Sequence, residues 1–151
     1  MTKILMVCLG NICRSPLAHG ILASKLTSKE HQVDSAGTSN YHVGDLPDKR
    51  SIEVARKNGL NITNQRGRQF QIEDFDYFDL IYVMDESNLQ NIVKLARNAE
   101  DITKVKLILN ESHPNKNLEV PDPYYRGNSG FDNVYKMLEE ACEIIAKKLN
   151  T

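Results

Sequence analysis

A cysteine and an arginine lie six positions apart near the start of the chain, in the segment CLGNICRS that runs from Cys8 to Ser15. A thiolate is a nucleophile, and a guanidinium can grip two oxygens of a phosphate at once. Where such a loop leads into a helix, the backbone amides and the positive end of the helix dipole favour a tetrahedral oxyanion. The pair therefore indicates attack on phosphorus, with Cys8 as nucleophile and Arg14 as phosphate-binding partner.

The other residues of this segment suit a phosphate-binding loop. Gly10 permits unusual backbone angles, and Asn11 tolerates left-handed ones or ties the loop with its side chain. The Ser15 hydroxyl has two candidate tasks, to donate a hydrogen bond to the Cys8 thiolate and to cap the helix that begins at Pro16. The sequence is compatible with either task or both.

A nucleophile that attacks a phosphate ester needs an acid to protonate the leaving oxygen. Asp122 is the candidate, because Pro121 and Pro123 stiffen its loop and fix the direction of its carboxyl group. Tyr124 and Tyr125 follow and would supply an aromatic wall beside the acid. An Asp-Pro pair alone also marks an ordinary turn, so the acid role needs support from the fold.

Strands and helices alternate along the chain and must position these groups. Strands are predicted at residues 3–9, 32–36, 77–84 and 105–109. Helices are predicted after Ser15, over 51–57, from 85 to 95 and over 131–149. This alternation is typical of the α/β class, and we predict one domain over residues 1–151. Its core would be a doubly wound, four-stranded parallel sheet in the flavodoxin-like order 2-1-3-4, with helices on both faces. The first strand ends at Cys8, at the edge where such sheets bind ligands.

Composition excludes several classes of protein. The 151 residues include 19 basic and 20 acidic ones, interspersed without the basic stripe of a nucleic-acid binder. No apolar stretch approaches the roughly 20 residues that span a bilayer, and the start lacks a secretory signal, so we expect a cytoplasmic protein. Three cysteines without a CxxC pair and four scattered histidines suggest neither disulfides nor a metal site. We predict no metal and no cofactor.

Four motifs in order along the chain resemble those of the low-molecular-weight protein tyrosine phosphatases. They are VCLGNICRSP at 7–16, DSAGT at 34–38, MDESN at 84–88 and DPYY at 122–125. The resemblance covers essentially the whole length. It implies a metal-independent phosphatase that acts on phosphotyrosine-containing proteins through a phosphocysteine intermediate. Inorganic phosphate would be its product and a competitive ligand, and the protein would be a monomer or a weak dimer.

The resemblance also implies roles for individual residues. Cys8 would be the nucleophile, Arg14 the phosphate binder and Asp122 the general acid. Substrate would be bound by the rest of the loop and by a groove of aromatic residues: Leu9, Gly10, Asn11, Ile12, Cys13, Ser15, Tyr41, Tyr124 and Tyr125. Ser35 would support the loop, and Cys13 would be a second thiol able to trap oxidised Cys8. Many relatives keep a histidine where this chain has Asn64-Gln65, so the sequence does not show which residue makes that supporting contact to the loop.

Three alternatives remain at this point. Protein-arginine phosphatases look similar but tend to carry threonine where this loop has Ile12, whose larger aliphatic group favours a flat aromatic substrate. Arsenate reductases of the same fold need further cysteines, and none occurs between Cys13 and Cys142. A noncatalytic phosphate-binding or redox module would form a reversible disulfide between Cys8 and Cys13 without turnover. Such a module would have no use for Arg14 together with Asp122.

Overall fold

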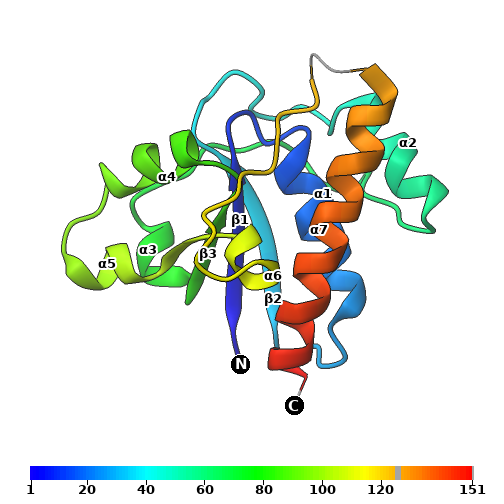
Figure 1. Ribbon diagram of the computed structural model, residues 1–151. Coiled ribbons are helices and arrows are strands. Elements are labelled where there is room, and N and C mark those ends of the chain that lie inside the picture. Colours follow the sequence, from blue (N-terminus) through cyan, green and yellow to red (C-terminus); the bar gives the residue numbers. More distant parts are fainter. Residues whose placement is uncertain (125–126, 151) are drawn as a thin grey trace.

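Four parallel strands form the central sheet of the protein, in the order β2-β1-β3-β4 (Figure 1). The computed structural model describes residues 1–124 and 127–150, with the side chains at 127–129 excepted. The strands are β1 (Lys3–Cys8), β2 (Gln32–Gly37), β3 (Leu80–Val83) and β4 (Val105–Leu107). The predicted order is confirmed, and it places β1 in the interior of the sheet between β2 and β3.

Alternate residues of β1 point to opposite faces of the sheet, as the pleat of a strand requires. Ile4, Met6 and Cys8 belong to one apolar cluster, whereas Leu5 and Val7 belong to the other. All five side chains are almost completely buried. A strand covered on both faces explains the continuous apolar run in the sequence, and it directs the Cys8 thiol to the face of the first cluster.

Helices cover both faces of the sheet (Figure 1). The first cluster includes side chains of α1 (Arg14–Lys25), α2 (Lys49–Lys57), α6 (Leu109–Ser112) and α7 (Gly127–Leu149). The second includes side chains of α3 (Asp74–Tyr77) and α4 (Glu86–Val93), and α5 (Ala99–Thr103) precedes β4. In the described parts of the chain, no helix combines the length and the apolar character needed to cross a membrane.

Three sequence expectations need correction. Tyr77 belongs to the one-turn helix α3, so the third strand begins at Leu80. The fourth strand ends at Leu107, and α6 begins two residues later. Ser15 does not cap α1, because the helix begins at Arg14 with Cys13 in the cap position. A serine ahead of proline is locally a good cap, but here its hydroxyl has partners within the loop instead.

The end of β2 supports the loop that follows β1. Cys8 pairs with Gly37 in the sheet register. A side chain at Gly37 would place its Cβ 2.7 Å from the carbonyl oxygen of Leu9 and 3.1 Å from the amide nitrogen of Asn11. Backbone atoms cannot move aside cheaply, so only glycine lets the loop pack this closely on β2.

Candidate active site

The Cys8 thiol lies at the start of the loop between β1 and α1, within reach of two donors. Its Sγ accepts a hydrogen bond from the Asn11 amide at 3.3 Å and lies 3.0 Å from Ser15 Oγ. Asn11 Nδ2 donates to the same Ser15 oxygen at 2.8 Å. Ser15 Oγ accepts this bond and keeps its own proton, which has two acceptors in reach, the Cys8 sulfur and the carbonyl oxygen of Ala36 at 3.4 Å.

Asn11 ties the loop together in a conformation that few residues adopt. Its φ of 59° lies in the left-handed region, which asparagine tolerates better than most side chains. The side chain is buried, and its Oδ1 accepts a hydrogen bond from the Arg68 amide at 3.0 Å while Nδ2 bonds to Ser15. Both expectations for Asn11, the left-handed backbone and the tying side chain, are confirmed.

Arg14 begins α1 and is buried at the far end of the loop. One terminal nitrogen, Nη1, donates to Asp85 Oδ2 at 2.6 Å and to the carbonyl of Val120 at 2.9 Å. The other, Nη2, lies 3.8 Å from Asp122 Oδ2. Burial works against the charge, but Cys8, Asp85 and Asp122 outweigh it and raise the pKa of Arg14, so the guanidinium stays charged.

The other two thiols are held in the neutral form. Burial raises the pKa of Cys13 far above its usual range, and the nearby acidic group of Asp48 adds to the effect. Burial likewise raises the pKa of Cys142 to about 12. Neither supplies a thiolate near neutral pH, which leaves Cys8 as the thiol with donors around its sulfur.

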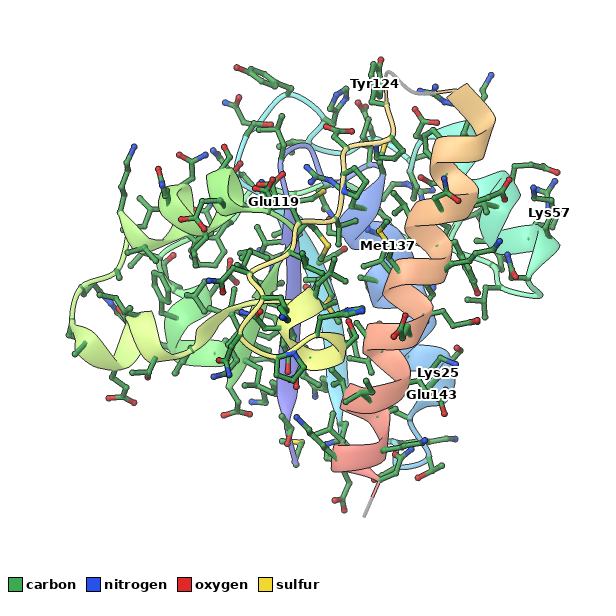
Figure 2. The ribbon with its side chains drawn as sticks, in the orientation of Figure 1. Lys25, Lys57, Glu119, Tyr124, Met137 and Glu143 are labelled. Carbon is green, nitrogen blue, oxygen red and sulfur yellow. The ribbon has the colours of Figure 1, made fainter. Side chains whose placement is uncertain are left out.

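A pocket of about 240 Å³ opens over the loop. Nine of the predicted residues line it: Cys8, Leu9, Gly10, Ile12, Cys13, Arg14, Tyr41, Asp122 and Tyr124. Asn11 is buried in the loop and Ser15 in the first turn of α1, and Tyr125 lies outside the described residues. Tyr124 lies on the segment that leads to α7, at the end of the molecule where β1 and β3 finish (Figure 2). Tyr41 is 78% exposed at the mouth of the pocket.

Ser35 lies on β2 and contacts two side chains near the base of α1. Its hydroxyl lies 3.2 Å from His19 Nδ1 and donates to Gln65 Oε1 at 3.4 Å. Gln65 Nε2 donates in turn to the carbonyl of Pro16 at 3.0 Å. Gln65, in the stretch where many relatives keep a histidine, therefore links β2 to the first turn of α1. Burial lowers the pKa of His19, which favours its neutral form.

Sequence reasoning missed two residues of the site. Asp85 was expected only to start a helix, and its Oδ1 does cap α4 by accepting the Asn88 amide. The second oxygen is the one that holds Arg14. The sequence signal for this role was that Asp85 directly follows the predicted strand that pairs with β1, at the edge of the sheet where ligands bind. His42 also lines the pocket, paired with Asp45 at 3.1 Å, and the scattered histidines gave no signal for it.

We predict that Asp85→Asn lowers kcat/KM by roughly 10- to 100-fold, the equivalent of one lost hydrogen bond between charged groups. Asparagine keeps an oxygen for the α4 cap, but its amide places hydrogens against the Arg14 guanidinium. Steady-state kinetics measures the effect. Asp76→Asn is the matched control, because Asp76 pairs with Arg97 at the same 2.6 Å on the exposed surface. Equal activity of the two variants would contradict a role for Asp85.

A thiol and a guanidinium joined by an anion-binding loop at the carboxyl edge of a parallel sheet define the class of cysteine-dependent phosphatases. The family model described as low molecular weight phosphotyrosine protein phosphatase matches residues 3–151, and the chain belongs to this family. A Dictyostelium discoideum protein of that name is 38% identical over 99% of this chain and 94% of its own length.

Solved structures agree with this assignment. A protein tyrosine phosphatase from Entamoeba histolytica superposes with a TM-score of 0.91 at 35% identity, over 99% of this chain and 97% of that one. A Drosophila arginine phosphatase gives 0.90 at 32% identity, over 100% and 99%. The fold is therefore shared by relatives that are named for two different substrates.

Proposed function

We propose that this protein-tyrosine phosphatase uses Cys8 as its nucleophile, Arg14 as its phosphate binder and Asp122 as its general acid and base. The observation that supports these roles is that all three side chains line one pocket, although they lie up to 114 positions apart in the sequence. Phosphoproteins are its substrates, as the family implies. We propose that the pocket binds phosphotyrosine.

In the first half of the reaction, the Cys8 thiolate attacks phosphorus in line with the tyrosine oxygen. The bond from phosphorus to sulfur forms as the bond from phosphorus to oxygen breaks, and Asp122 gives its proton to the departing oxygen. Free tyrosine and a phosphocysteine result. In the second half, Asp122 takes a proton from water, which attacks phosphorus, releases inorganic phosphate and restores the thiolate.

Both halves place negative charge on the non-bridging phosphate oxygens. Arg14 supplies a fixed positive charge there, because Asp85 and the Val120 carbonyl hold one side of its guanidinium. Preorganised charge of this kind is commonly the largest contribution to catalysis, since nothing must reorient during the reaction. The protein side chains therefore supply the electrostatic stabilisation, and we expect turnover to need no metal ion.

A second candidate substrate is phosphoarginine, favoured by the likeness to the Drosophila arginine phosphatase. The apolar side chains that line the pocket weigh against it. Ile12 lines the pocket together with Leu9 and Tyr41, and this apolar lining suits a flat ring better than a charged guanidinium. Phosphotyrosine therefore remains the proposed substrate.

The test is phosphate release from two peptides of one sequence, one with phosphotyrosine and one with phosphoarginine, in the presence of chelator and reductant. We expect at least about a hundredfold preference for phosphotyrosine, the size of discrimination that matched pocket contacts provide. A preference for phosphoarginine would reassign the substrate. Release that stopped on addition of chelator would contradict the metal-free mechanism.

The nucleophilic thiol also bears on location. Cys8 must stay reduced to react, and reducing compartments keep thiols in that state, so we propose that the protein works in the cytoplasm. We also propose that the protein is a monomer or a weak dimer. Size-exclusion chromatography with light scattering over a range of concentrations measures that assembly.

A further inference from the structure

Arg50 lies in the first turn of α2 and contacts two aromatic rings that come from distant parts of the chain. Its guanidinium carbon is 5.1 Å from the ring centre of Tyr124 and 4.6 Å from that of Phe131. Tyr124 lines the pocket, and Phe131 is a buried residue near the start of α7. Both distances fall within the roughly 6 Å over which a cation and an aromatic face attract each other.

The guanidinium is fixed at its edge as well as at its faces. Arg50 Nε and Nη2 donate to the two carboxylate oxygens of Asp48 at 3.1 and 3.2 Å. A planar fork held along one edge keeps its flat faces available for stacking. Asp48 is itself attached to the phosphate-binding loop, because its amide donates to the carbonyl of Ile12 at 2.7 Å. A continuous chain of contacts therefore runs from the loop through Asp48 and Arg50 to Tyr124.

We propose that Arg50 is a positioning residue for substrate selectivity, which holds the ring of Tyr124 at the pocket mouth to receive the phenyl group of phosphotyrosine. This inference rests on the proposed function and adds a residue to it. Tyr124 is 41% exposed, and its amide donates to Asp122 Oδ1, so Arg50 contacts a ring that is partly open to solvent beside the proposed acid. The contact with Arg50 restricts that ring before substrate arrives.

Ring binding and phosphate binding can be measured separately, because inorganic phosphate has no ring. For Arg50→Gln we expect KM for a phosphotyrosine peptide to rise by about three- to tenfold, the range of a cation–aromatic contact with partial exposure. The inhibition constant of inorganic phosphate should change by less than twofold. Arg50→Lys keeps the cation without the planar fork and should recover part of the loss.

Arg56→Gln is the matched control, since Arg56 lies on the same helix, is 70% exposed on its side chain and pairs only weakly with Glu53 at 3.4 Å. Its KM should equal that of the native protein. Tyr124→Leu removes the ring, so adding Arg50→Gln to that variant should raise KM no further.

Three outcomes separate the possibilities. Native protein that releases no phosphate from the peptide overturns the proposed function itself. Turnover by the native protein, with equal KM values for Arg50→Gln and Arg56→Gln, overturns only the role of Arg50. A rise in KM matched by an equal rise in the inhibition constant of phosphate would mean that Arg50 acts on the loop through Asp48, which also contradicts selectivity through Tyr124.

Discussion

Cys8→Ser should lower phosphate release from a phosphotyrosine peptide by at least about 10⁴-fold, the scale on which removal of a nucleophile acts. Serine is nearly the same size and fits beside the Asn11 amide and the Ser15 hydroxyl, but a hydroxyl is a far weaker nucleophile than a cysteine sulfur. Steady-state phosphate release measures the loss.

Binding should survive this change, because Arg14 and the loop are untouched. Inorganic phosphate should raise the melting temperature of Cys8→Ser and of the native protein by similar amounts. Cys142→Ala is the thiol control, since that buried cysteine lies on α7 away from the pocket and its loss should leave turnover near the native value. Native-like turnover by Cys8→Ser would exclude Cys8 as the nucleophile.

Asp122→Asn should lower kcat for phosphotyrosine by roughly 10²- to 10³-fold, within the range that a positioned general acid contributes. The amide fits the same space and can still accept the Tyr124 amide hydrogen bond that orients the carboxylate, but it has no proton to give. The loss should depend on the leaving group. An aryl phosphate whose phenol leaves readily, such as p-nitrophenyl phosphate, should lose much less, because its oxygen needs little protonation.

Asp132→Asn controls for the loss of one exposed carboxylate near the same end of the protein. Its side chain is 43% exposed and pairs with Lys57, while that of Asp122 is 39% exposed. The control should behave like the native protein with both substrates. Equal losses for the two substrates with Asp122→Asn would show that Asp122 acts on phosphate binding instead of on leaving-group protonation.

Much of this site could be predicted from local sequence, because its central piece is local. The segment from Cys8 to Ser15 contains the proposed nucleophile, the proposed phosphate binder and the loop between them. The strand before it is a continuous apolar run, because both of its faces are buried, and the helix after it repeats apolar residues at helical spacing on its buried face. The strand order could also be predicted, because strands that alternate with helices are joined by right-handed crossovers and few topologies satisfy that rule.

What the sequence did not reveal depends on contacts between distant segments. The one-turn helices α3 and α6 are too short to have a periodicity of their own, so they depend on packing for stability. Asp85 caps α4, and this local role is enough to explain an aspartate at that position in the sequence. Its second role, the hydrogen bond with Arg14, depends on the tertiary structure. Ser15 likewise fits a cap pattern, and only the packed loop shows that Asn11 and Cys8 are its neighbours.

Arg14 donates hydrogen bonds to the Asp85 carboxylate and the Val120 carbonyl, which lie 71 and 106 positions further along the chain. Contacts over such separations form late in folding, because the entropy of closing long loops must be offset first. A nascent chain that has emerged only as far as α2 already contains Cys8 and Arg14, yet the guanidinium has nothing to hold it in place. Recovery of turnover during refolding should therefore lag behind the appearance of the helices, whose hydrogen bonds are local.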